Sequence, residues 1–278
     1  MKNKRHIVAF SGGHSSALVA LEVVAKYGRE NVILLNHNIS KRVEDDDIKR
    51  FKNEISTFLK IPITYANMDG WENTDQFDIS RNEKAFKTKN TPALCTNRLK
   101  TSPFHKWLNE NGIPENDIIY YGFDKNEPDR IFRRRKILKE MGYESDFPLA
   151  LWKNRRYEST EDIGIIPPLQ YNSFKHANCI GCIKGGKQHW YVVYCLRPDI
   201  FKKAKETEEY IGHSILKEKK GPLYLKDLEC TFDKMKRLGV KPTEHIKHQK
   251  FWADVAKILK EPTLENYDEF IKPCMCTT

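Results

Sequence analysis

The sequence lacks any long apolar run. No stretch approaches the ~20 residues that a membrane-spanning helix needs. The basic residues at the N-terminus are followed only by a short apolar run at 7–10, whereas a signal peptide needs a longer one. Apolar residues make up 39% of the chain and charged residues 31%, a balance typical of a soluble globular protein. We therefore expect a cytoplasmic protein with no membrane partner.

The sequence also does not predict a framework of disulfides, because the number of cysteines, seven, is odd and no secretion signal is present. Metal binding or redox chemistry is therefore the better interpretation of these thiols. Acidic residues are also fewer than basic ones, 38 against 48, so the net charge is +10. This excess suits either a solvated lysine-rich surface or an anionic ligand, which could be a nucleotide or a nucleic acid.

Strand and helix patterns alternate in the first half of the chain. Short apolar runs predict four strands, at 6–10, 32–35, 63–66 and 118–121. Helical spacing predicts helices at 17–25 and 45–59. Alternation of this kind predicts an α/β fold, with a doubly wound, mainly parallel sheet, right-handed crossovers and helices on both faces. The polar stretch 69–90 is expected to form a long loop.

The second half has a different character. After residue 171 strand patterns fade, and helical spacing predicts helices at 198–210, 223–238 and 246–259. We expect an α/β domain over residues 1–170 and a helical, cysteine-containing C-terminal part over 171–278.

A glycine pair follows the first predicted strand, in a loop that lacks both the Walker A pattern and Gly-x-Gly-x-x-Gly. Glycines let a backbone approach a ligand, and N–H groups at a helix start bind anions. The serines add hydroxyl donors, and one of them can cap the helix. The loop predicts a phosphate site, with a plain strand–helix turn as the alternative. Its residues are Ser11, Gly12, Gly13, His14, Ser15 and Ser16.

Asn36 ends the second predicted strand. Ligands of open α/β sheets bind at the carboxyl ends of the strands, so we expect Asn36 at the same site. The alternative is an ordinary polar turn.

Cys179 and Cys182 form a Cys-x-x-Cys loop, which can bring two thiolates onto one metal. With Cys95 as a third ligand, the pattern predicts a metal or cluster site. Cys195 is the preferred fourth ligand, and His189 is the alternative, which suits zinc better than iron–sulfur. Redox-idle thiols are the remaining interpretation.

The glycine loop resembles the Ser-Gly-Gly-x-x-Ser loop of the PP-loop superfamily, which includes ATP pyrophosphatases, tRNA thiolases and the PAPS/APS reductases. His14 and Ser15 stand where many of the ATPases carry Lys-Asp, a change that the reductase branch tolerates. Two further segments match the reductases, and the second resembles their phage-type relatives. The matching residues are Cys95, Lys100, Pro103 and Phe104, then Gly122, Glu127, Pro128 and Arg130, with Asp124 in place of an expected arginine.

The resemblance implies an adenine nucleotide alpha hydrolase-like fold that binds PAPS, APS or ATP. The implied nucleotide contacts are the glycine loop with Asn36, Lys100, Gly122, Glu127 and Arg130. It also implies a 4Fe-4S cluster, with zinc as the alternative, and a thiol reductant protein as partner. The implied metal ligands are Cys95, Cys179 and Cys182; Cys195 is preferred as the fourth because it is nearest in sequence, and a three-cysteine cluster with one free iron is a further alternative.

Reductases of this family use a thiolate on a C-terminal tail to attack sulfur. Cys274 and Cys276 lie in such a tail, with extra metal ligation or a frayed end as alternatives. Sulfonucleotide reduction is the leading hypothesis. The alternatives are an ATP-dependent sulfur transferase acting on tRNA or DNA, and a non-catalytic nucleotide- or nucleic-acid-binding module. Basic residues at 133–136 and 153–156 suit either a nucleic-acid patch or a solvated face.

Overall fold

The computed structural model describes residues 4–87, 93–177 and 179–260. Within these ranges the chain separates into two compact units. The first holds 4–75, 96–171 and 176–177, and the second holds 76–87, 93–95, 172–175 and 179–260. The segment before Cys95 thus clusters with the C-terminal part, although it precedes residue 170 in the chain. No helix within the described ranges has the length and apolar character that crossing a membrane requires.

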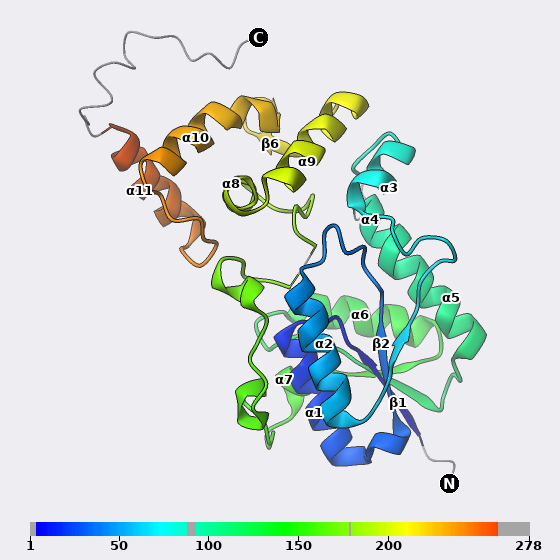
Figure 1. Ribbon diagram of the computed structural model, residues 1–278. Coiled ribbons are helices and arrows are strands. Elements are labelled where there is room, and N and C mark those ends of the chain that lie inside the picture. Colours follow the sequence, from blue (N-terminus) through cyan, green and yellow to red (C-terminus); the bar gives the residue numbers. More distant parts are fainter. Residues whose placement is uncertain (1–3, 88–92, 178, 261–278) are drawn as a thin grey trace. The chain divides into compact units, whose positions relative to one another are not determined.

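The first unit is built on a five-stranded parallel sheet of order β3-β2-β1-β4-β5. This confirms the predicted α/β class and parallel sheet (Figure 1). The order reverses between β1 and β4, the position at which open α/β sheets bind ligands. The strands are β1 Arg5–Ala9, β2 Val32–Asn36, β3 Ile63–Tyr65, β4 Asp117–Tyr120 and β5 Glu144–Asp146.

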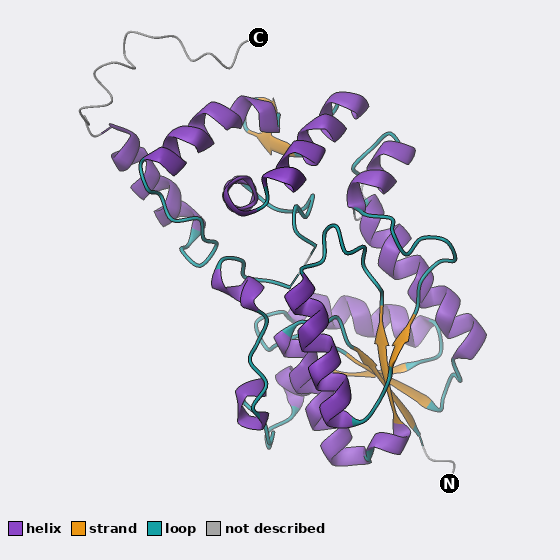
Figure 2. Cartoon of the chain, in the orientation of Figure 1, coloured by secondary structure: helices purple, strands orange, loops and turns teal. Residues whose placement is uncertain are grey.

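Helices cover both faces of this sheet, as a doubly wound fold requires (Figure 2). One core contains buried residues of α1 (His14–Tyr27) and α2 (Asp46–Leu59). The other contains residues of α5 (Ser102–Asn111) and α6 (Pro128–Glu140). The shorter elements are η1 Arg29–Asn31, α4 Leu94–Thr96, η2 Asn97–Thr101, α7 Pro148–Leu151, η3 Thr160–Ile163 and η4 Leu169–Asn172.

Local chemistry sets the helix ends in this unit. Asp45 caps α2 by accepting the N–H of Asp47, and the two acidic residues of the first turn suit the positive end of the helix.

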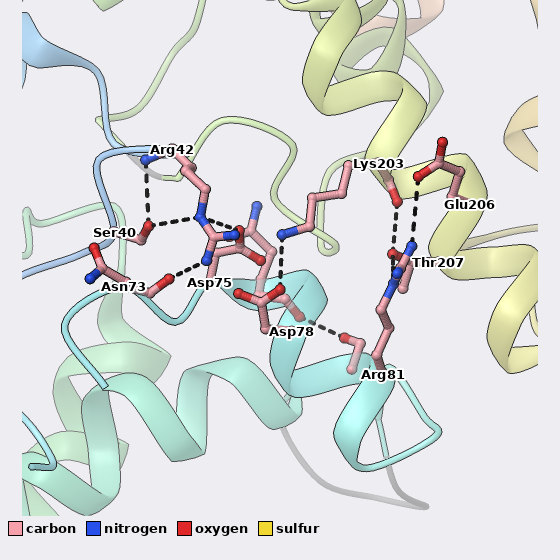
Figure 3. Close-up of polar contacts among 11 residues, drawn as sticks. Ser40, Arg42, Asn73, Asp75, Asp78, Arg81, Lys203, Glu206 and Thr207 are labelled. Atoms are coloured by element: carbon pink, nitrogen blue, oxygen red, sulfur yellow. Dashed lines mark hydrogen bonds and ion pairs between the residues drawn. The ribbon is translucent and has the colours of Figure 1, made fainter. Parts of the chain in front are cut away.

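The loop after β2 is held by Arg42, which contacts Ser40, the Asn73 carbonyl and the buried carboxylate of Asp75 (Figure 3). The sheet and its loops therefore form one well-connected support for residues at the carboxyl ends of the strands.

The second unit is mainly helical. Its helices are α3 Gln76–Asn82, α8 Lys187–Leu196, α9 Pro198–Ile211, α10 Glu229–Arg237 and α11 His248–Lys260, with η5 Leu225–Leu228 before α10. Helices α3 and α9 are joined by Lys203 to Asp78 at 2.9 Å and by Arg81 to the Thr207 hydroxyl at 3.0 Å (Figure 3).

Three expectations for secondary structure were wrong. The polar stretch 69–90 contains α3, whose Phe77 and Ile79 are buried. Strands do occur after residue 171, because β6 (Leu216–Glu218) and β7 (Gly221–Leu223) form an antiparallel hairpin. The helix expected to begin at 223 begins at Glu229, after that strand and a 3-10 turn.

Candidate nucleotide site

The glycine loop leads directly from β1 into α1. The helix begins at His14 with Gly13 as its N-cap. The first N–H groups of a helix have no intrahelical acceptor, and they attract anions. The N–H of His14 is donated to the hydroxyl oxygen of Tyr171 at 3.1 Å. Within the described ranges the N–H groups of Ser15 and Ser16 have no acceptor in the protein.

Both glycines have close neighbours inside the unit. Gly12 has a φ of 81°, and a Cβ there would lie 2.8 Å from the Cγ and Cδ atoms of Lys52. A Cβ on Gly13 would lie 3.1 Å from the hydroxyl of Tyr171. The glycine loop is therefore packed closely against α2 and Tyr171.

The polar side chains of the loop act mainly on the protein itself. Ser16 donates its hydroxyl to the Gly13 carbonyl at 2.8 Å, so the expectation that a serine caps the helix was wrong. The Nε2 atom of His14 accepts the N–H of Thr160 at 3.2 Å, and burial lowers the pKa of the ring. His14 thus contributes its backbone to the loop, while its imidazole joins α1 to η3.

A cavity of about 190 Å³ lies at the carboxyl ends of β1, β2 and β4, next to the glycine loop. It contains three residues of the predicted site, Ser11, Asn36 and Lys100. The Asn36 amide donates to the Phe10 carbonyl and so joins the ends of β1 and β2. The lining is Ala9, Phe10, Ser11, Leu35, Asn36, His37, Thr96, Lys100, Thr101, Phe104, Tyr121 and Arg134.

Two cations line this cavity. Lys100 comes from η2, a π-helical turn of the kind often found at functional sites. Arg134 comes from α6, and its guanidinium carbon lies 5.2 Å from the centre of the Tyr121 ring. The cavity therefore combines apolar and aromatic walls with two positive side chains, which suits an anionic ligand with a flat ring.

His37 supplies a neutral polar group. Its Nδ1 must donate to the Ala66 carbonyl, 2.6 Å away, because a carbonyl oxygen can only accept. Burial, partly opposed by this bond, lowers the pKa of His37 to about 4. The ring is therefore neutral near pH 7, and its Nε2 is an acceptor. This role could not be predicted from the residues around His37, because Ala66 is distant along the chain.

Gly122 is placed by a close backbone approach. A Cβ on it would lie 3.0 Å from backbone atoms of Ser15 and Ser16, so a larger residue would push the loop after β4 away from the start of α1. Glu127 and Arg130, the other predicted contacts in this segment, do not line the cavity. Arg130 pairs with Glu127 and stacks on Phe123 with its guanidinium carbon 4.1 Å from the ring centre.

Arg134, which sequence reasoning missed, lines the cavity in place of Arg130. The two residues are four apart on α6, so they share a face of that helix. That spacing was the available signal, but four consecutive basic residues in the sequence concealed it.

The predicted metal ligands all belong to the second unit. The Cys182 carbonyl accepts the N–H of Gly185 at 2.7 Å, which closes a tight turn before α8. His189 donates from Nδ1 to Glu244 at 2.6 Å, and its buried Nε2 has no hydrogen-bond partner within the described ranges. Metal-bound histidines commonly have such a carboxylate partner.

Cys195 lies near the other end of α8, about 9 Å along the helix axis from His189. Its thiol contacts Tyr191, and burial raises the pKa of that thiol. Among residues 4–87, 93–177 and 179–260, no three histidine, cysteine or acidic side chains are grouped to hold a metal ion. The metal site stays a prediction from the sequence. Cys274 and Cys276 lie outside the described residues.

Comparison with known proteins gives one distant relative. The chain is 27% identical over 208 residues to the uncharacterised nin region protein ORF290 of Escherichia phage lambda, covering 66% of this chain and 67% of that protein. No protein-family model matches the chain. No solved structure matches it either.

Proposed function

We propose that the cavity of the first unit binds an adenine nucleotide, with its phosphates toward the glycine loop and its base against the aromatic wall. One observation carries the proposal: the cavity lies at the point where the strand order reverses, beside the glycine loop that leads into α1. Lys100 and Arg134 supply the positive charge that a polyanionic ligand needs. Phe104 and Tyr121 supply apolar surface for a flat base.

The chemistry that we propose is reduction of an adenylyl sulfonucleotide such as PAPS or APS. This choice rests on the resemblance of the ordered motifs to the PAPS/APS reductases. A cysteine thiolate attacks the sulfur, the bond from sulfur to the phosphate oxygen breaks, and the nucleotide leaves with both electrons of that bond. A second thiol then attacks the cysteine sulfur, which releases sulfite and forms a disulfide. Cys274 and Cys276 are the candidate nucleophiles, and a thiol reductant restores them.

A cluster or metal at Cys95, Cys179 and Cys182 belongs to the same resemblance. The described residues assemble no three-ligand group, so no step of this reaction is assigned to a metal.

Sulfite release from PAPS and APS in the presence of a thiol reductant tests the reaction. The full chain should release sulfite, Lys100→Ala should lower kcat/KM about tenfold or more, and Cys274→Ser with Cys276→Ser should abolish release. Lys106→Ala is the matched control, because Lys106 is an exposed lysine of α5 outside the cavity. Turnover of ATP to AMP that requires nucleic acid, without sulfite release, would assign the chain to the sulfur transferases instead.

A further inference from the structure

Three aromatic rings form a compact cluster beside β4 and β5 in the first unit. The ring centres of Tyr121 and Phe123 are 5.4 Å apart, those of Phe123 and Phe147 are 5.9 Å apart, and those of Tyr121 and Phe147 are 6.2 Å apart. The planes in these pairs are inclined by 23°, 18° and 22°. The three rings therefore form a triangle in which each ring packs against the other two.

Three arginines of α6 each lie over one ring of this cluster. The guanidinium carbon of Arg130 is 4.1 Å from the centre of Phe123, that of Arg134 is 5.2 Å from Tyr121, and that of Arg135 is 5.6 Å from Phe147. Contact with a ring holds a guanidinium in place while leaving its N–H groups available to phosphate.

A second, smaller hollow of about 110 Å³ opens among these side chains. Its walls are Phe123, Arg130, Arg133, Arg134 and Ile137. Arg134 lines both this hollow and the larger cavity. An anion in the hollow would therefore meet the side chains of three arginines beside Phe123.

The charge on α6 is strongly unbalanced. The helix carries six basic residues and two acidic ones. Arg130 pairs with Glu127, and Lys136 lies 4.0 Å from Glu140. No carboxylate among the described residues lies within ion-pair distance of Arg133, Arg134 or Arg135. On the same helix Phe132 is 72% exposed, an unusual position for a large apolar ring.

The second basic segment, at 153–156, is on the other side of the sheet. Trp152 packs with the core beneath α1 and α2, whereas Leu138 of α6 belongs to the opposite core. The two segments therefore do not form one patch. The α6 arginine surface, defined as Arg130, Arg133, Arg134 and Arg135 with Phe132, has to be considered by itself.

We propose that the α6 arginine surface binds a single strand of nucleic acid. The guanidinium groups contact successive phosphates, and an unstacked base lies on the exposed ring of Phe132. Positive charge alone would suit any polyanion, but the exposed ring of Phe132, which shares a face of α6 with Arg135 three residues along, adds a stacking surface of the kind that single strands use. The inference does not depend on the proposed function, because Arg133, Arg135 and Phe132 do not line the larger cavity.

Fluorescence anisotropy with a labelled strand of about 15 nucleotides tests the proposal on the full chain. Phe132→Ala should weaken binding about tenfold. Arg133→Ala with Arg135→Ala should weaken it by more, and the slope of log affinity against log salt should become shallower by about one unit. Lys153→Ala with Arg155→Ala, which removes two exposed cations from the other face, should leave binding unchanged.

Two further measurements separate this proposal from its rivals. A duplex of the same length and a poly-glutamate peptide of matched charge should bind more weakly than the single strand. The proposal would be overturned if the peptide bound as tightly as the single strand. It would also be overturned if Lys153→Ala with Arg155→Ala weakened strand binding as much as Arg133→Ala with Arg135→Ala. Lys100→Ala should keep strand binding while losing nucleotide binding, so failure of the proposed cavity and failure of the arginine surface give different results.

Discussion

Lys52 and Glu44 form a buried ion pair beneath the glycine loop. The Nζ atom of Lys52 lies 3.0 and 2.9 Å from the two carboxylate oxygens of Glu44, and both residues are buried. The aliphatic part of Lys52 occupies the space that a side chain on Gly12 would need. A lysine on the apolar face of α2 thus explains why the loop has glycine at this position.

Removing one partner of this pair should be costly. Lys52→Met leaves the Glu44 carboxylate buried without its cation, and we expect a loss of about 3–5 kcal/mol in the free energy of unfolding. Lys52→Met combined with Glu44→Leu should recover most of that loss, because an apolar pair needs no charge compensation. Urea unfolding measures both. Lys49→Met on the same helix is the control and should change stability by less than about 0.5 kcal/mol. Equal free energies of unfolding for Lys52→Met and Lys49→Met would contradict this account.

Gly122→Ala tests the close approach of two loops. The added Cβ would lie 3.0 Å from the backbone of Ser15 and Ser16, so the first turn of α1 must move. We expect a loss of about 1–3 kcal/mol in stability and a nucleotide affinity weaker by about tenfold. Calorimetry and thermal unfolding measure these. Gly186→Ala, where a Cβ meets open space at the N-cap of α8, should leave the nucleotide affinity unchanged.

Much of the first unit could be predicted from the sequence, because its strands are short apolar runs and its helices are strongly periodic. Strand β5 was missed, since its residues are Glu-Ser-Asp and an edge strand buries little. Helix α3 was missed because Phe77 and Ile79 are its only strongly apolar signals in a polar segment.

The site was predictable to a lesser degree. The glycine loop, Asn36 and Lys100 could be found because their residue types and positions after strands carry a local signal. His37 could not, because its role depends on the Ala66 carbonyl of another loop. Arg134 could not, because only the packing of α6 decides which of several arginines faces the cavity.

Glu208 should make the second unit sensitive to pH. Its carboxylate oxygens accept the N–H groups of Ile215 and Leu225 at 2.6 and 2.7 Å, yet burial raises the pKa of Glu208 to about 7. The folded pKa exceeds the ordinary value of 4.5, so its stabilising contribution is complete below pH 4.5 and is lost as the pH rises through 7. The change amounts to about 3 kcal/mol at most.

Glu208→Gln removes this titration. The stability of the variant, measured by urea unfolding, should vary less than that of the native chain between pH 4.5 and 7. Glu110→Gln, at an exposed position of α5, should keep the native profile. Identical profiles for Glu208→Gln and the native chain would show that this carboxyl does not titrate there.

His37 should make the first unit less stable as the pH falls, which is the opposite of the effect of Glu208. Its folded pKa of about 4 is below the ordinary 6.5, so its contribution is complete above pH 6.5 and is lost as the pH falls through 4. His37→Gln keeps a donor for the Ala66 carbonyl but cannot titrate. Unfolding measured between pH 6.5 and 4 should therefore show a smaller loss of stability in the variant, by up to about 3 kcal/mol. An unchanged acid profile would contradict the buried, neutral ring.

The most direct test of the central claim is isothermal calorimetry of the full chain with AMP, ATP, APS and PAPS. The account predicts one site per chain for at least one of these nucleotides. Lys100→Ala and Arg134→Ala should each weaken it about tenfold or more, and Lys139→Ala on the surface of α6 should leave it unchanged. Two results would contradict the assignment of the cavity as a nucleotide site. One is the absence of heat with all four nucleotides, and the other is native affinity in the Lys100→Ala and Arg134→Ala variants.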